Sequence, residues 1–259
     1  MKLTFLGTGT SNGIPVIGCS CPVCTSDDAR DMRTRTSAVV EIDGKRILID
    51  TSPELRLQAR ATGLDRIDAV LFTHPHADHV GGFDDLRRFN QINQAKLPVY
   101  ADEVTSKNIR QRFAYAFESP FPFFGGKPDL DLHVFDGPFE VLGIPVLPFQ
   151  VGHGGWTVNG FRFGDLVYLT DAKIIPEKTM DAMRGARLLV INALRRKPHP
   201  VHLSLDEALA VIEEIGPERA FIVHISHEMG CHSEVSAGLP DGVALAQEGI
   251  VASLNADPG

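Results

Sequence analysis

Residues 73–82, THPHADHVGG, hold four potential metal ligands within six positions: His74, His76, Asp78 and His79. They follow an apolar run of strand type. Alternate residues of an extended segment point to the same side, so His74 and His76 can share one ion. We expect Asp78 and His79 to follow at a turn, with side chains that diverge toward a second ion. Exposed loop histidines without a common role are the alternative, but such clusters at strand ends rarely occur without ligation or catalysis.

Several other strand-type runs also end at a histidine or an aspartate. Loops after strands are where a rigid scaffold usually presents reactive groups. A single residue of this kind is more often part of a turn or a cap, so each one taken alone is a weak candidate. These residues are Asp50, His153, Asp171 and His224.

A second reactive group is the run GCSCPVCTS, which contains Cys19, Cys21 and Cys24. A closed tetrahedral metal site needs four ligands, and the only other cysteine, Cys231, lies about two hundred residues further on. Three clustered cysteines plus one do not make a disulfide framework for a chain of this size, and in a reducing compartment such spacing more often indicates metal. Either these thiols serve another purpose, or a distant residue closes a metal site.

The composition is that of an ordinary globular chain of 259 residues with a formal net charge of −8. This charge argues against a nucleic-acid-binding surface, but it leaves room for a small anionic substrate because bound divalent metals reverse the local field. No apolar run is long enough to span a membrane and the start of the chain has no signal-peptide organisation. We therefore expect a cytoplasmic protein without a membrane partner.

The elements that must position these residues are mostly strands, with helices between some of them. A helix is expected from Pro53 to the stop at Gly63, and another from the cap Ser204, with Glu207 three residues later, to Gly216. No repeat or linker interrupts the chain, so the pattern predicts one α/β domain over residues 1–259, built from layered sheets. The strand-type runs are residues 2–7, 37–42, 46–50, 69–73, 98–101, 140–149, 166–170, 187–191 and 219–225.

The stretch THPHADH resembles the H-x-H-x-D-H signature of the metallo-β-lactamase superfamily, and the resemblance extends along most of the chain. The superfamily has a third histidine, a bridging aspartate and a final histidine, which match His153 in FQVGHGG, Asp171 in VYLTDAK and His224 in FIVHISH. The resemblance implies a four-layer αββα sandwich with metals at the strand ends. The order of these matches relative to THPHADH is what makes the later residues strong candidates.

The resemblance also implies two catalytic ions held by imidazoles and carboxylates, which suit zinc, manganese or iron. Two close cations lower the pKa of a bound water and supply a metal-bridging hydroxide, an arrangement that suits displacement at phosphorus. The implied ligands are His74, His76 and His153 for one ion and Asp78, His79 and His224 for the other, with Asp171 bridging both.

Within the superfamily, GTGTSNGIPVIGCSCPVC resembles the phosphonate-pathway cyclic-phosphate phosphodiesterase (PhnP-like) branch. That branch implies a structural zinc on a cysteine-rich loop, here at about residues 8–37, which is tied to the strand that delivers the last catalytic ligand. The fourth zinc ligand is a histidine three residues after that ligand, which is His227 in this chain. The implied set is Cys19, Cys21, Cys24 and His227, with Cys231 or His232 as the alternative fourth ligand.

The same branch implies a histidine before a helix that protonates the leaving oxygen, because an alkoxide leaves poorly without a proton. His202 is the better match, two residues ahead of Ser204, and His199 is the other candidate. A surface-loop histidine is the alternative interpretation.

Asp78 is counted as catalytic as well as a ligand. The basic run at residues 195–197 is taken as a solvated turn and is left out of the site.

We therefore predict a dinuclear-metal phosphodiesterase for a small phosphodiester, with a cyclic ribose phosphate as one candidate. The alternatives are a lactone, carboxylic ester or thioester hydrolase of the same fold, or a non-catalytic cofactor-biosynthesis protein of the kind linked to pyrroloquinoline quinone. No nucleic-acid partner is expected, and a homodimer is left open. The phenylalanine-rich segment 113–124 predicts a pocket lid, a dimer contact or core packing.

Overall fold

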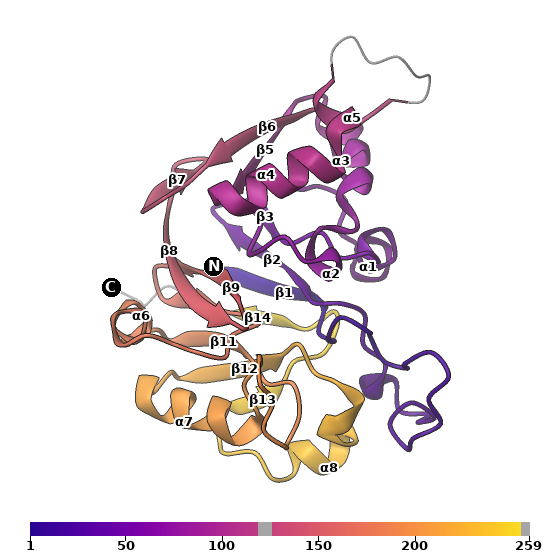
Figure 1. The fold of residues 1–259 in the computed structure, drawn as a ribbon, viewed down its shortest axis with the longest axis vertical. Coiled ribbons are helices and arrows are strands. Elements are labelled where there is room, and N and C mark those ends of the chain that lie inside the picture. The colour runs from indigo at the N-terminus through magenta and orange to yellow at the C-terminus, as the bar shows by residue number, and fades with distance from the viewer. Residues whose placement is uncertain (119–125, 255–259) are drawn as a thin grey trace.

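Two β-sheets lie face to face in the computed structural model, which describes residues 1–118 and 126–254 (Figure 1). Within these residues each sheet has seven strands. In order across the first sheet, these are β14 (Val251–Ser253), β1 (Lys2–Gly7), β2 (Ser37–Ile42), β3 (Lys45–Ile49), β4 (Ala69–Leu71), β5 (Leu97–Ala101) and β6 (Leu130–Val134). The second sheet runs β13 (Val243–Leu245), β12 (Arg219–Val223), β11 (Leu188–Asn192), β10 (Leu166–Tyr168), β9 (Trp156–Phe163), β8 (Ile144–His153) and β7 (Phe139–Val141).

The central strands, such as β4, β10 and β11, are buried on both faces, which is why they read as nearly continuous apolar runs in the sequence. In β3, Ile47 and Ile49 enter the core between the sheets, whereas Leu48 faces the helices outside. In β11, Val190 enters the core between the sheets and Leu189 packs outward against the other helices. Successive side chains thus fill two cores at once, as the period of two requires.

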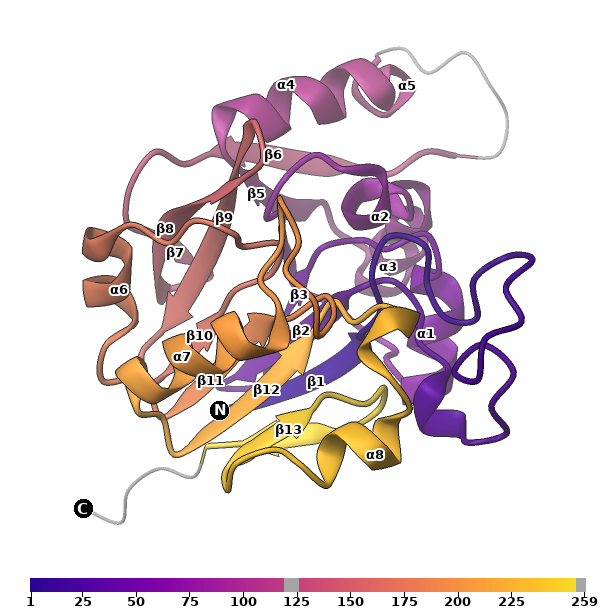
Figure 2. The same ribbon diagram turned by 60° about the horizontal axis from the view of Figure 1, so that its bottom comes forward.

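Helices cover the outer face of each sheet, as Figure 2 shows. The first five pack on the first sheet and the last three on the second, so the layers are helix, sheet, sheet and helix, as predicted. The helices are α1 (Leu55–Thr62), α2 (Ala77–Val80), α3 (Leu86–Asn93), α4 (Glu103–Arg112), α5 (Ala114–Phe117), α6 (Glu177–Met183), α7 (Leu205–Ile215) and α8 (His232–Ser236). Short 3-10 turns lie at Ala29–Asp31, Phe83–Asp85 and His227–Met229.

The predicted helix caps are confirmed in α7 and hold in part in α1. Ser204 and Glu207 form a reciprocal capping box, and Gly216 ends α7 in the left-handed conformation. α1 ends at Gly63 as predicted but begins at Leu55, because the proline and the residue after it form a turn that precedes the helix.

Two local predictions were wrong. The run 140–149 is two strands, since Leu142 and Gly143 both have positive φ (55° and 81°) and form a two-residue hairpin turn between β7 and β8. Asp78 and His79 lie in the one-turn helix α2, where a turn was expected, because the backbone N–H groups of His79 and Val80 both donate to the carbonyl of His76.

The sheet topology brings the reactive loops together. β3 to β6 run parallel in the first sheet, and β10 to β13 run parallel in the second. In parallel sheets the crevice outside the carboxyl ends of the strands is the usual place for a ligand. The C-terminal strand β14 returns to pair with β1, and the segment between β1 and β2, residues 8–36, projects from the body (Figure 1).

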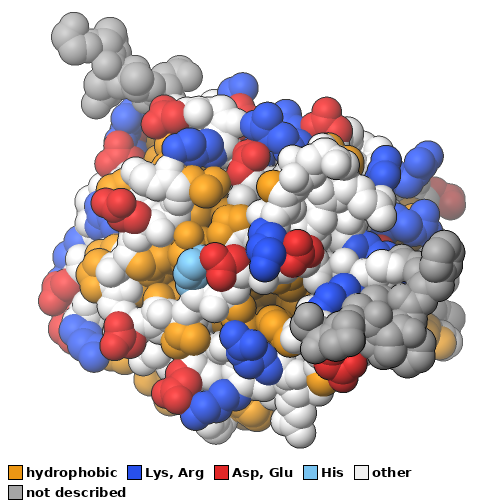
Figure 3. Space-filling view, turned by 90° about the horizontal axis from the view of Figure 1, so that it is seen from above, with side chains coloured by type: hydrophobic (Ala, Val, Ile, Leu, Met, Phe, Trp, Pro, Cys, Tyr) orange, Lys and Arg blue, Asp and Glu red, His pale blue; other side chains and the backbone are white. Residues whose placement is uncertain are grey.

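The face seen from above in Figure 3 carries apolar side chains in its middle, with acidic and basic side chains interspersed around them. This face therefore shows no broad basic field of the kind that nucleic-acid-binding proteins use. Among the described residues, no helix combines the length and the apolar character needed to cross a membrane.

Candidate metal centre

The predicted site residues converge at the carboxyl ends of strands from both sheets. β3 is followed by Asp50, β10 by a short segment to Asp171, and β12 by His224. All three have positive φ, at 61°, 56° and 57°. A left-handed residue directly after a strand turns the chain sharply, and aspartate and histidine tolerate it better than most other residues. The turn aims each side chain back toward the strand ends.

One group contains His74, His76 and His153, whose ligand atoms all lie within 4.8 Å of one another. The ring centroids of His74 and His76 are 4.5 Å apart, which confirms that the two alternate residues face the same side. The Nδ1 atom of His153 lies 2.8 Å from the carbonyl oxygen of Val201, an N–H donor geometry that leaves Nε2 directed at the group. The Thr73 hydroxyl lies 3.0 Å from Nδ1 of His74 and leaves its Nε2 free in the same way.

A second group contains Asp78, His79 and His224, again with ligand atoms within 4.8 Å. Asp171 lies against this group, with Oδ2 3.2 Å from Nε2 of His79 and Oδ1 3.2 Å from Nε2 of His224. Asp171 also falls within ligand distance of His74 on the other side. The structure therefore places Asp171 between the two groups, where the resemblance implied a bridging carboxylate.

The chemistry of this cluster fits a divalent metal centre. Four of its imidazole nitrogens are buried without a hydrogen bond of good geometry among the described residues, although two of them lie 3.2 Å from Asp171, and a buried polar atom of that kind calls for a further ligand. The donors are imidazoles and carboxylates, the set that zinc, manganese and iron accept. The four atoms are Nε2 of His74, Nε2 of His79, and Nδ1 and Nε2 of His224.

The acidic and basic side chains of the cluster shift one another's pKa values. Burial acts to raise the pKa of Asp78, but His79 and His224 outweigh it and hold the pKa below its ordinary value. Burial likewise acts to lower the pKa of His79, but the surrounding carboxylates of Asp78, Asp171 and Asp50 outweigh it and raise the pKa. The pKa of Asp171 is likewise held below its ordinary value against the effect of burial, by His224 and His79, so Asp78 and Asp171 are ionised and available to a cation. Burial raises the pKa of Asp50, which faces His79 from the other side.

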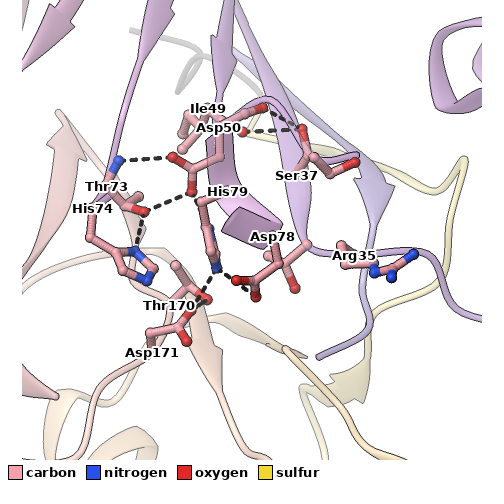
Figure 4. A network of polar contacts seen from close by, with 12 residues as sticks. Arg35, Ser37, Ile49, Asp50, Thr73, His74, Asp78, His79, Thr170 and Asp171 are labelled. Carbon is pink, nitrogen blue, oxygen red and sulfur yellow. Dashed lines mark hydrogen bonds and ion pairs between the residues drawn. The ribbon is translucent and has the colours of Figure 1, made fainter. Parts of the chain in front are cut away.

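Asp50 is a site residue that the predicted ligand set left out. It is fully buried and accepts hydrogen bonds from the backbone N–H and the hydroxyl of Thr73, at 2.8 and 2.7 Å. Its Oδ2 also lies 2.7 Å from Nδ1 of His79, and Figure 4 shows these contacts around one carboxylate. Its own carbonyl accepts from the Ser37 hydroxyl at 2.8 Å. Asp50 thus orients His79 from behind, and the ILID run ending at an aspartate was the signal for it.

His202 lies beside the cluster and His199 lies outside it. The His202 ring is 4.6 Å from that of His153 and 4.8 Å from that of His224, and its Nδ1 is 3.7 Å from Oδ1 of Asp171. His199 contacts only the far side of this group, with its ring 5.2 Å from His202. Burial first, and the nearby His224 second, lower the pKa of His202 to about 3. Of the two candidates for the general acid, the geometry favours His202.

The cysteine run meets a distant histidine, as the resemblance implied. Nδ1 of His227 lies 3.3, 3.5 and 3.4 Å from the Sγ atoms of Cys19, Cys21 and Cys24. With Zn–S bonds of about 2.3 Å and a Zn–N bond of about 2.0 Å, a tetrahedral site puts sulfur and nitrogen about 3.5 Å apart. The four residues therefore match the geometry of a closed Cys₃His zinc site.

The thiols differ from one another in pKa, and the alternative ligand His232 has other partners. A backbone hydrogen bond from Cys24 lowers the pKa of Cys21 to about 6, while burial raises the pKa of Cys24 to about 11. His232 is engaged elsewhere, with its ring nitrogens 3.0 Å from Arg33 Nη2 and from Gln247 Nε2.

The loop that carries the cysteines is joined to the end of β12. The backbone N–H of Thr10 donates to the carbonyl of Ile225 at 3.0 Å, and that of Ile225 donates to the carbonyl of Thr8 at 3.0 Å. Ile225 directly follows His224, so the loop supports the same strand end that delivers a residue of the metal cluster.

Two further predicted features fall outside the cluster. Arg195 forms an ion pair with Glu228 at 2.5 Å, which agrees with leaving the basic run out of the site. In the phenylalanine-rich segment, Phe113, Tyr115 and Phe117 are partly buried against the core of the first sheet. Residues 119–125 of that segment lie outside the described residues.

Comparisons with known proteins identify relatives over most of the chain. A family model for the beta-lactamase superfamily domain matches residues 45–225. A crystal structure described as that of a new diphosphatase from the PhnP family is 40% identical, with a TM-score of 0.89 over 97% of this chain and 96% of that one.

Curated relatives are matched over only part of their own length. An octanoyltransferase of Porphyromonas gingivalis is 41% identical over 98% of this chain, which spans 52% of that protein. A coenzyme PQQ synthesis protein B of a Methylobacterium species is 39% identical over 42% of this chain and 41% of its own length. The chain thus spans about half the length of these relatives or less.

We predict that Asp50→Asn weakens metal binding at the cluster. The amide removes the negative charge behind His79, and the loss of such an orienting partner typically costs about 10- to 100-fold in metal affinity. Competition with a chelator of known affinity measures this change in the folded variant. Asp165→Asn, at an exposed position, is the control. Equal metal affinity in Asp50→Asn and the unmodified protein would contradict the orienting role.

Proposed function

The chain belongs to the metallo-β-lactamase superfamily, in its PhnP-like branch, and we propose that it is a phosphodiesterase that uses two divalent ions to hydrolyse a small phosphodiester. Membership in the superfamily, together with the similarity to a PhnP-family diphosphatase, supports a metal-dependent hydrolase. The observation that carries the finer proposal is the position of Asp171 between two groups of converging imidazoles, with His202 beside them. Similarity to the diphosphatase supports chemistry at phosphorus.

We propose that His74, His76 and His153 hold one ion, that Asp78, His79 and His224 hold the other, and that Asp171 is shared. When bound, two such ions, zinc or manganese, lower the pKa of water and balance the charge that builds on phosphate oxygens.

The protein residues orient this centre and handle the protons. His153 is fixed by the carbonyl of Val201 and His79 by Asp50, so neither ring needs to reorganise during the reaction. Asp78 is ionised, so besides holding an ion it can orient the attacking water by accepting a hydrogen bond from it. His202 donates a proton to the leaving oxygen, and the negative charge of the substrate raises the pKa of the ring toward the range where it carries that proton.

A second candidate is hydrolysis of a carboxylic ester, lactone or thioester by the same centre. The similarity to the octanoyltransferase favours acyl chemistry, although the chain spans only about half of that protein. A non-catalytic role like that of a cofactor-biosynthesis protein is less well supported, because the complete set of predicted ligands converges here. We also propose that the substrate is a small molecule and that no nucleic acid binds, in keeping with the net charge of −8.

The experiment that tests the proposal compares substrate classes on metal-loaded protein. We expect turnover of bis(4-nitrophenyl) phosphate, of a ribose cyclic phosphate or of a diphosphate diester, and little of a lactone or an acyl thioester. Asp171→Asn, folded by circular dichroism, should lose the activity because the shared carboxylate is gone. Turnover confined to the lactone or thioester would replace this proposal by the second candidate.

Metal content separates the two kinds of site. We predict about three ions per loaded chain, two at the catalytic centre and one structural zinc held by Cys19, Cys21, Cys24 and His227. Cys21→Ser should lose one zinc and lower the melting temperature, because structural zinc binding is coupled to folding. Cys231→Ser is the matched control and should change neither. Unchanged zinc content in Cys21→Ser, measured by elemental analysis, would rule out the structural site.

His202→Ala should act on the leaving group alone. An alkoxide needs a proton, so hydrolysis of a ribose cyclic phosphate should slow by about a hundredfold or more. A nitrophenolate leaves unprotonated at neutral pH, so activity on the nitrophenyl ester should persist, with metal content unchanged. His199→Ala should keep both activities. Equal losses on both substrates in His202→Ala would indicate a role in binding or structure.

A further inference from the structure

Trp156 stands at the edge of the metal cluster with its side chain open to solvent. It is 45% exposed, in contrast to the buried His153 with which it pairs. Its ring lies edge-on to that of His76, with centroids 5.6 Å apart. Tryptophan buries a large apolar area when it can, so a half-exposed ring beside a polar centre is a candidate contact for a ligand.

The hairpin that carries Trp156 is fixed in place. Trp156 pairs with His153 across β8 and β9, through a turn at Gly154 and Gly155. Gly154 has a φ of 60°, which suits the first central residue of a tight hairpin turn. A Cβ atom there would come within 3.0 Å of a methyl group of Val201, so the turn packs closely on the loop that leads to His202.

The rings around the centre form a continuous series. Trp156 contacts His76, His76 contacts His153, and His153 contacts His202, with neighbouring centroids 5.6, 5.3 and 4.6 Å apart. Trp156 and His202 stand at the two ends of this series. A phosphodiester has two substituents, and if one leaves next to His202, the other extends toward Trp156.

We infer that Trp156 is a stacking platform for a planar group on the retained part of the substrate, which makes the substrate a phosphate ester of a nucleoside. This inference rests on the proposed function, in that the phosphate binds at the metal cluster. Every nucleobase has a π-face, and a base stacked on an aromatic side chain typically strengthens binding by about tenfold to a hundredfold. Such stacking accepts different bases, so it selects a class of substrate more than a single one.

Two ligands that differ only by the base test the inference on zinc-loaded protein: adenosine 5′-monophosphate and ribose 5-phosphate. Trp156 is the only tryptophan of the chain, so its fluorescence reports on this position alone. We expect the adenosine ligand to quench it and ribose 5-phosphate to leave it nearly unchanged. Calorimetry should show that the adenosine ligand binds about tenfold tighter or more.

Variants assign the difference to the indole ring. Trp156→Ala should reduce the affinity for adenosine 5′-monophosphate to that for ribose 5-phosphate, and Trp156→Phe should recover most of the preference. Leu57→Ala, which truncates a similarly exposed apolar side chain on α1, is the control and should retain the preference.

Two outcomes would overturn the inference. One is equal affinity of the unmodified protein for both ligands, including no measurable binding of either. The other is a preference for the adenosine ligand that survives in Trp156→Ala. Neither outcome depends on turnover, so the binding result stands apart from the phosphodiesterase assay. A protein that hydrolyses small phosphodiesters but shows equal affinities would retain the proposed function and lose this inference.

Discussion

His79 is held between two buried carboxylates, one from each sheet, and the rest of the centre depends on this contact. Nδ1 lies 2.7 Å from Asp50, which follows β3, and Nε2 lies 3.2 Å from Asp171, which follows β10 by a short segment. A buried charge is costly unless it is paired, so each aspartate requires the imidazole between them. The pairing therefore joins the ends of the two sheets at the place where the reactive side chains gather.

The backbone supports this arrangement at some cost. Asp50, Asp171 and His224 all adopt the left-handed conformation just after a strand. Such residues typically carry about 1–3 kcal/mol of strain each and persist where the surrounding contacts fix them. Here the contacts are buried hydrogen bonds and ion pairs, and the resulting turns direct three side chains from different strands into one cluster. Functional sites are where backbone strain of this kind collects.

The segment after β12 serves two sites at once. His224 faces the imidazole and carboxylate cluster, and His227, three residues later, faces the cysteines of the segment between β1 and β2. A metal held by the cysteines and His227 would stabilise the strand end that carries His224, so the structural and catalytic sites are mechanically linked. The formal charge of −8 does not oppose a phosphate ester, because metal ions are the largest local charges in such a site.

The sequence by itself determined the layered fold and pointed to most of the side chains that converge in the cluster. These predictions rest on local patterns, which the periods of strands and helices set. The patterns are the spacing of His74 and His76, the aspartate or histidine after an apolar run, and the capping box at Ser204. Contacts between residues far apart in the sequence could not be predicted from such patterns. The role of Asp50 behind His79 depends on which strands become neighbours, and so does the place of Trp156 beside His76. The strand β9 was not predicted, because Gly160 interrupts its apolar pattern. That glycine is needed where the Phe149 ring of β8 packs against the backbone of β9. Only the tertiary structure decided these contacts, since they join segments that local sequence does not relate.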